Sequence, residues 1–290
     1  MIGGALEVAV KLLKDGQVIG IPTETVYGLA ANALNEKSVV SIFEIKNRPF
    51  FDPLILHFSD IASIQKYVLD FNSNALKLAE AFWPGPLTLL LNKNELVPDI
   101  VTAGSHLVAV RIPDHPLTLS LLRHLDFPLA APSANPFGTI SPTEAKHVTD
   151  YFNEKIPMVL DGGICKNGIE STIIDCTNNE PTILRSGFIT KNHLAKKLNL
   201  TAKIIGENQL QFSGNFKSHY SPKAKVVIGE SAKAGEGLIA SSVVETPDGA
   251  IRLAAPKSIE EYARTLYSAL REGDKEGLGV IHILPPQGEG

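Results

Sequence analysis

The chain contains only two cysteines in 290 residues, Cys165 and Cys176, and neither belongs to a C-x-x-C pair or stands near a histidine cluster. This excludes a disulfide-rich scaffold and argues against a structural zinc site, so we expect two reduced, buried thiols. The longest apolar runs are too short for a membrane span, and the N-terminal stretch mixes charges into a helical pattern, unlike a secretory signal. The sequence therefore favours a cytoplasmic protein with no membrane association.

Strong charge of one sign and the common nucleotide and hydrolase motifs are also missing. There are 27 Lys and Arg against 31 Asp and Glu, a net charge of −4, which does not indicate tight nucleic-acid binding overall. The sequence has no G-x-x-x-x-G-K-[ST], H-E-x-x-H or G-x-S-x-G motif, and no Ser or Cys nucleophile is paired with a recognisable base. Any chemistry should therefore depend on positioning and charge stabilisation, without a covalent intermediate.

Short apolar strands that alternate with amphipathic helices predict an α/β or mixed α+β fold with a helix-covered sheet. The expected helices are 6–13, 36–46, 74–83 and 116–125, and the expected strands are 18–22, 53–58, 87–92, 106–113, 127–136, 156–163 and 171–177. Beyond a polar stretch that begins near residue 206, strands 224–229 and 277–284 flank a helix, 258–277, with Ser258 as its N-cap. These changes in composition and pattern along the chain predict a domain over 1–205, a linker over 206–222 and a small α/β domain over 223–290.

The segment PTETVYGL, residues 22–29, is the first candidate site. Extended backbone would direct the hydroxyls of Thr23 and Thr25 to one side, and Gly28 would let a ligand approach the backbone. An ordinary turn with hydroxyl caps is the alternative.

The second candidate site is KNRPFFDPLILH, residues 46–57. Because Pro49 disfavours helix at Arg48, Lys46 should end a helix and Arg48 should follow on extended chain, so both cations could converge on one phosphate. Complementation of a helix dipole by Lys46 is the alternative, and His57 in isolation is read as a structural histidine.

Ser133 and Asn135, between two prolines, should place two polar side chains on one face of a strand end. Ser141 is expected to be the N-cap of a following helix, with Glu144 as its partner. Further along the chain, three polar residues stand at strand ends, where sheets of this class usually bind ligands: Arg111, Ser171 and Arg185.

Taken together, these segments resemble the threonylcarbamoyl-AMP synthase family, whose catalytic unit is the YrdC-like domain. The signature is K-x-R at Lys46 and Arg48 followed by S-x-N at Ser133 and Asn135, and the resemblance covers roughly residues 4 to 200. It implies a twisted mixed sheet with a concave, positively lined cleft flanked by helices, and the linker resembles that of longer members with a small α/β C-terminal domain.

The resemblance implies a nucleotidyltransferase that condenses L-threonine, bicarbonate or CO₂, and ATP into threonylcarbamoyl-AMP and pyrophosphate. The product would pass to a downstream tRNA-modifying transferase complex, and a weak contact with RNA is possible. Mg²⁺ would enter with ATP, held by phosphate oxygens and water with no dedicated protein ligands.

The resemblance also assigns residues to these substrates. Four are implied as L-threonine contacts: Thr25, His57, Arg111 and Ser171. Five are implied as ATP contacts: Arg48, Asp52, Ser133, Ser141 and Arg185. Lys46, Arg48, Ser133 and Asn135 form the implied catalytic set, and His219 and Tyr220 match the linker that folds over the active-site mouth in longer members.

Three features depart from the family pattern. Leu107 stands where a threonine hydroxyl near ATP is usual, Asp52 stands where asparagine is common, and the C-terminal domain looks truncated. Two other functions are weighed against the synthase: a related carbamoyl-adenylate-forming enzyme with another acceptor, as in hydrogenase maturation, and a non-catalytic RNA-binding protein. The first normally carries acylphosphatase and zinc-finger segments, and the second is disfavoured by the net charge of −4 and by the lack of an RNP-like aromatic pattern.

Overall fold

The computed structural model describes residues 2–178, 180–198, 203–204 and 221–286. In these residues a mixed sheet of nine strands has the order β1-β2-β6-β3-β5-β4-β7-β8-β9, which confirms the predicted fold class. Its strands are β1 (Ile19–Ile21), β2 (Gly28–Asn32), β3 (Ile55–His57), β4 (Leu87–Asn92), β5 (Leu107–Arg111), β6 (Leu129–Ala130), β7 (Thr172–Asp175), β8 (Thr182–Arg185) and β9 (Lys203–Ile204). The helices around it are α1 (Ile2–Lys14), α2 (Glu36–Lys46), α3 (Ile61–Gln65), α4 (Ser73–Phe82), α5 (Asp99–Thr102), α6 (Pro116–Arg123), α7 (Ala145–Phe152) and α8 (Lys191–Leu198).

Alternation of side chains along the strands divides the core between the two faces of this sheet. Leu56 of β3 and Val108 and Val110 of β5 pack in the main cluster, together with apolar residues of α2 and α4. A second cluster joins α1 and α6 to the opposite face, near β1, β2 and β6. Ile55, His57 and Arg111 alternate with the main-cluster residues, so they point to this second face.

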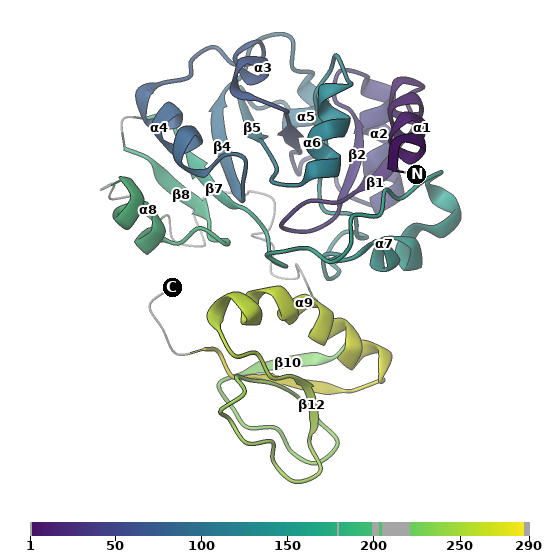
Figure 1. The fold of residues 1–290 in the computed structure, drawn as a ribbon, viewed down its shortest axis with the longest axis vertical. Helices are drawn as coiled ribbons and strands as arrows, with labels where there is room; N and C mark the ends of the chain where they lie inside the picture. The colour runs from purple at the N-terminus through teal and green to yellow at the C-terminus, as the bar shows by residue number, and fades with distance from the viewer. Residues whose placement is uncertain (1, 179, 199–202, 205–220, 287–290) are drawn as a thin grey trace.

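A smaller unit follows in which four strands are all parallel, in the order β10-β13-β11-β12. Its elements are β10 (Lys225–Ile228), β11 (Gly237–Ile239), β12 (Ile251–Ala254), α9 (Ile259–Lys275) and β13 (Val280–Ile283). Ser258 caps α9 by accepting a hydrogen bond from the Glu261 amide at 3.1 Å, as predicted. Figure 1 shows α9 between its own sheet and the larger unit.

Several local predictions are corrected by the structure. The run GLAAN pairs with β1 and β6 as strand β2, a strand that is not among those expected from the sequence. Residues 156–163 contribute an isolated bridge between Val159 and Gly20, where a strand was expected. Ser141 is not a helix cap, because α7 begins at Ala145 with Glu144 at its N-cap.

The predictions for the cysteines and for the linker have different outcomes: the first is confirmed and the second stays a prediction. Both cysteines are buried and free, as expected. The predicted linker, 206–222, lies outside the described residues except for its last two positions, so the domain limits stay a prediction. In the described part of the chain, none of the helices has the length and apolar character needed to cross a bilayer.

Contacts between the two units are close at Gly168, which has a φ of +73°. A Cβ there would stand 2.5 Å from the Arg264 carbonyl oxygen of α9. Gly163 has a similar φ of +80°, but a Cβ there would meet nothing within 4 Å.

This pair of glycines supplies a controlled test of the contact with α9. We expect Gly168→Ala and Gly163→Ala each to lose about 1 kcal/mol of unfolding free energy through left-handed backbone strain. Gly168→Ala should lose more, and amide hydrogen exchange within α9 should accelerate in that variant alone. Equal exchange of α9 in the two variants would contradict the close contact.

Candidate functional site

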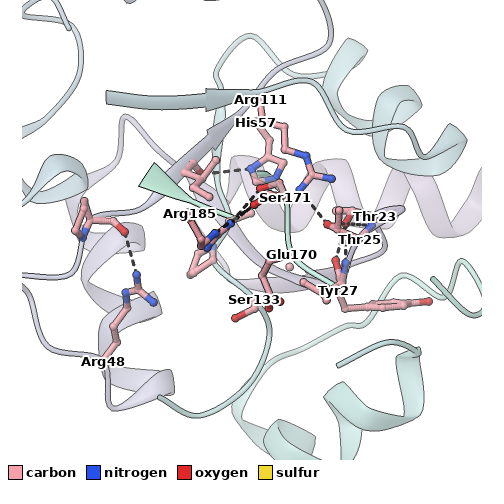
Figure 2. Close-up of a pocket in the computed structure, with 16 residues that line it drawn as sticks. Thr23, Thr25, Tyr27, Arg48, His57, Arg111, Ser133, Glu170, Ser171 and Arg185 are labelled. Carbon is pink, nitrogen blue, oxygen red and sulfur yellow. Dashed lines mark hydrogen bonds between the residues drawn. The ribbon is translucent and has the colours of Figure 1, made fainter. Parts of the chain in front are cut away.

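A pocket of about 550 Å³, including the space open to solvent, lies on the sheet face opposite α2 and α4. Residues from distant parts of the chain line the pocket. Figure 2 labels ten of them and shows that they come from several elements and surround the same pocket. Nine of the predicted or candidate residues lie in its wall: Thr23, Thr25, Gly28, Arg48, His57, Arg111, Ser133, Ser171 and Arg185. Four others are absent from the wall: Lys46, Asp52, Asn135 and Ser141.

The segment between β1 and β2 presents the two threonine hydroxyls, as the alternation of residues predicted. The hydroxyl oxygens of Thr23 and Thr25 are 2.9 Å apart, and Thr23 also accepts a hydrogen bond from the Val26 amide at 3.3 Å. Gly28 forms an isolated bridge with Ser133, so the backbone joins this segment to the predicted S-x-N segment. The two segments therefore form one continuous wall.

Arg111 ends β5 and is held from three sides. Its guanidinium forms an ion pair of 2.6 Å with Glu24 and donates hydrogen bonds to the Thr25 hydroxyl at 2.9 Å and the Gly85 carbonyl at 3.3 Å. The second oxygen of Glu24 accepts a hydrogen bond from the Asp114 amide at 3.0 Å. Because both charged groups are buried, the pair fixes the guanidinium while leaving it in the pocket wall.

His57 is aligned with Arg111, because the two residues are register partners at the ends of the parallel strands β3 and β5. Burial is the main cause that lowers the pKa of His57 to about 3, and the nearby Arg111 lowers it further. His57 is therefore a neutral imidazole at physiological pH. Such a ring can donate or accept a hydrogen bond to a ligand without adding charge.

Arg185 and Ser171 are brought together by the antiparallel strands β7 and β8. The Arg185 guanidinium donates to the Ser171 carbonyl at 3.0 Å and to its hydroxyl at 3.1 Å. The Ser171 hydroxyl also lies 2.8 Å from that of Thr88. Arg185 is only partly buried, so this cation faces the pocket and remains accessible to an anion.

The sequence suggested that Lys46 and Arg48 could converge on one anion, but the structure does not place them so. The ammonium of Lys46 is buried and donates to the carbonyls of Ser133, at 2.5 Å, and Asn135. Burial, followed by the charge of Arg48, holds the pKa of Lys46 well below its usual value. Lys46 therefore supports the S-x-N segment from behind the wall, and a catalytic role for it stays a prediction.

Asn135 and Ser133 also separate into two roles. Ser133 lines the pocket, whereas the Asn135 amide is turned into its own loop and donates to the Pro136 and Thr139 carbonyls at 3.0 and 2.8 Å. The Asn135 Oδ1 atom has no hydrogen-bond partner among the described residues. The K-x-R and S-x-N motifs are thus joined through Lys46, which confirms that these distant segments meet.

Arg48 and Asp52 form a buried ion pair of 2.8 Å, and Arg48 also donates to the Pro53 carbonyl at 2.9 Å. The charge of Asp52 is therefore balanced by Arg48. Leu107 packs beside Leu90, Ile173 and Leu184 and is absent from the pocket wall, so the structure gives it no contact in this site.

Sequence reasoning missed two carboxylates of the site. Glu24 stands between the two threonines and balances Arg111. Glu170 lines the pocket, and its two oxygens accept hydrogen bonds from Ser141 and from Tyr267 of α9, both at 2.5 Å. The acidic residue within PTET could have suggested a buried ion pair, but the contact of Glu170 with Tyr267 joins residues 97 apart and has no local sequence signal.

Metal ligands are not grouped here: the described residues contain no cluster of three or more His, Cys, Asp or Glu that could hold a metal ion. The wall offers three guanidinium groups, which fit phosphate or carboxylate oxygens. His219 and Tyr220 lie outside the described residues, so their predicted place over the pocket mouth stays a prediction.

Two family models match the chain. The Sua5/YciO/YrdC model, with the description "Telomere recombination", matches residues 11–187, and the model of the threonylcarbamoyl-AMP synthase C-terminal domain matches residues 189–290.

Named relatives match over most of the chain. The threonylcarbamoyl-AMP synthase of Pyrococcus abyssi is 38% identical over 299 residues, which cover 95% of this chain and 87% of that protein. The Bacillus subtilis protein of the same name is 41% identical, and the match covers 77% of this chain and 66% of the relative. The chain thus matches most of one relative's length and just under two thirds of the other's.

Solved structures agree with these matches. The crystal structure of P. abyssi Sua5 complexed with L-threonine aligns with a TM-score of 0.89 at 36% identity, and covers 97% of this chain and 89% of that one. Escherichia coli YciO aligns with a TM-score of 0.59 at 21% identity and covers 68% of this chain and 94% of that one. The second likeness shows a shared fold.

The burial of His57 predicts how stability depends on pH. Between about pH 3 and its ordinary pKa near 6.5, only the unfolded state takes up the proton, so unfolding free energy should fall as pH decreases from 6.5. The contribution of His57 should be about 2 kcal/mol between pH 6.5 and pH 5. Chemical denaturation at both values should show a slope in His57→Asn that is smaller than the wild-type slope by this amount, while the lowered pKa values of His115 and His147 add to the slope of both proteins.

The exposed His106 supplies the matched control, because His106→Asn should keep the wild-type slope. A full wild-type slope in His57→Asn would mean that the buried ring is not kept neutral.

Proposed function

Because the chain belongs to the Sua5/YciO/YrdC family, we propose that it is an L-threonylcarbamoyladenylate synthase. In this reaction the threonine amine adds to CO₂ and loses a proton, or displaces water from bicarbonate, to give N-carboxythreonine. A carbamate oxygen then attacks the α-phosphorus of ATP, the bond to the β-phosphate breaks, and pyrophosphate leaves. The product is threonylcarbamoyl-AMP, an intermediate of tRNA modification.

One observation carries this proposal: a single pocket combines a site suited to a small amino acid with separate cations suited to phosphates. Thr25, His57 and Arg111 are joined by strand register and hydrogen bonding, and Arg111 suits a carboxylate. Threonine carries both a carboxylate and a hydroxyl, which match a guanidinium and a neutral polar wall. The L-threonine complex of the P. abyssi protein supports this assignment.

Arg48 and Arg185 are proposed to bind the triphosphate, with Ser133 as a further donor. Figure 2 shows Arg48 apart from the Arg111 group, with Arg185 and Ser171 drawn between them. Fixed guanidinium groups stabilise charge that moves onto pyrophosphate as it leaves, and they need no reorganisation at that moment. Asp52 acts through Arg48 in this scheme, and Ser141 acts through Glu170.

Mg²⁺ remains part of the proposal as an ion that enters with ATP. Its ligands would be phosphate oxygens and water, and when bound it would neutralise charge on the departing pyrophosphate. The protein groups that face it would be the cations of the wall and Glu170, the one carboxylate among the described residues that line the pocket.

The remaining partners are also proposals. Bicarbonate is the proposed carbon source, and a transferase complex that modifies tRNA would consume the product, so the cytoplasm is the proposed location. A weak RNA contact is retained, since delivery of a labile adenylate would benefit from a nearby acceptor. The likeness to HypF, at 20% identity, shows the fold alone and so does not favour the hydrogenase-maturation alternative.

The proposal is tested by pyrophosphate release from ATP, which should require both threonine and bicarbonate. We expect Arg185→Gln to lower kcat/KM at least tenfold, because the change removes a partly exposed positive charge from the pocket wall, where charge would develop on the leaving pyrophosphate. Arg123→Gln, at the exposed end of α6, is the matched control and should retain wild-type rates.

Pyrophosphate release that does not depend on threonine, or equal rates in the two variants, would overturn this assignment. Circular dichroism of both variants would show whether the fold is retained.

A further inference from the structure

A tyrosine of the smaller unit reaches the pocket wall of the larger one. Tyr267 of α9 is 7% exposed, and its hydroxyl donates to Glu170 Oε2 at 2.5 Å. Glu170 Oε1 accepts a hydrogen bond from the fully buried Ser141 hydroxyl, also at 2.5 Å. Both carboxylate oxygens of this pocket residue are therefore engaged, one from each unit.

The position of Glu170 gives this contact a consequence for charge. Glu170 lines the same pocket as Arg185 and directly precedes Ser171, which Arg185 binds. A carboxylate in a pocket that accepts a triphosphate repels the phosphates unless it is turned aside or paired. Hydrogen bonds to both oxygens fix the orientation of the group and disperse its charge away from the pocket.

Docking of α9 does not depend on this hydroxyl alone. The Arg271 guanidinium donates to the Ile140 carbonyl and lies 4.6 Å from the centre of the Tyr151 ring. Residues of α9, including Leu270 and the Tyr267 ring, also share a cluster with Val26 and Ile140 of the larger unit. Removal of the Tyr267 hydroxyl therefore leaves the packing and the cation–π contact in place.

We propose that Tyr267 is a positioning residue for nucleotide binding: α9 supplies the hydroxyl that, with Ser141, holds the Glu170 carboxylate against the wall and away from the triphosphate. This inference rests on the proposed function, because it assumes that ATP occupies the pocket. It assigns the smaller unit a direct part in the site, through one hydrogen bond that crosses between the units.

The test is Tyr267→Phe, which removes the hydroxyl and keeps the ring. We expect KM for ATP to rise about five- to twentyfold, which is the loss of one charge-assisted hydrogen bond. KM for threonine and kcat should stay within twofold of the wild type. Tyr262→Phe is the matched control on the same helix, because the Tyr262 hydroxyl donates to the Leu284 carbonyl at 3.0 Å inside the smaller unit.

A second comparison tests whether Tyr267 acts through Glu170. Tyr267→Phe should have no further effect on KM for ATP in a Glu170→Gln background, because the charge that it orients is then absent. A full additional effect would overturn the proposal, and so would an equal loss in Tyr262→Phe. A fall in the thermal stability of Tyr267→Phe with unchanged KM values would show that Tyr267 only helps to hold the two units together, which would also overturn the proposal.

Direct titration of ATP into each variant by calorimetry separates this inference from the proposed function. If the wild type binds ATP but releases no pyrophosphate with threonine and bicarbonate, the proposed function fails and the titration still tests Tyr267. Equal ATP affinity in the wild type and Tyr267→Phe would refute the positioning role.

Discussion

The buried charge of Arg111 is the constraint on which the pocket depends. A guanidinium out of water needs a counter-charge and hydrogen bonds to its remaining donors, and Glu24, Thr25 and Gly85 supply them. Loss of one partner of such a pair typically costs about 3 to 5 kcal/mol. The segment between β1 and β2 is therefore held to the end of β5 by electrostatics as well as by packing, and the threonine hydroxyls are fixed as a result.

The two units are joined by polar contacts next to the pocket and by apolar packing of α9. Both Tyr267 and Arg271 reach the segment around Ile140 and Ser141, directly or through Glu170. A site that is built partly at such a junction gains precision from the larger body but also depends on how the smaller unit docks. The family likeness, which extends over both matched segments, is consistent with a shared role.

Much of the fold could be predicted from the sequence because its signals are local. Helix α2 and strand β4 begin and end where caps, apolar period and composition indicate, and Asn35 caps α2 through two backbone amides. Strand β2 was missed because its short run of small residues has little intrinsic preference, and pairing with β1 and β6 decides its conformation. Ser141 matches a capping pattern, yet Glu170 takes its hydroxyl instead.

The site residues show the same difference between features with a local sequence signal and features that depend on distant contacts. The two threonines and the strand-end residues were predictable from alternation, since position along a strand fixes the face. The orientation of Lys46 was not, because it depends on carbonyl groups far along the chain.

His57 and Arg111 are opposite each other in the pairing of β3 with β5. Neighbouring residues in a strand point to opposite faces of the sheet. A shift of the β3 register by one residue would therefore move the His57 side chain to the opposite face, among the side chains of α2 and α4. Misalignment of these strands would thus bury an imidazole in the apolar layer and remove it from the pocket in one step. Correct strand pairing and a complete binding site are, for this protein, the same event.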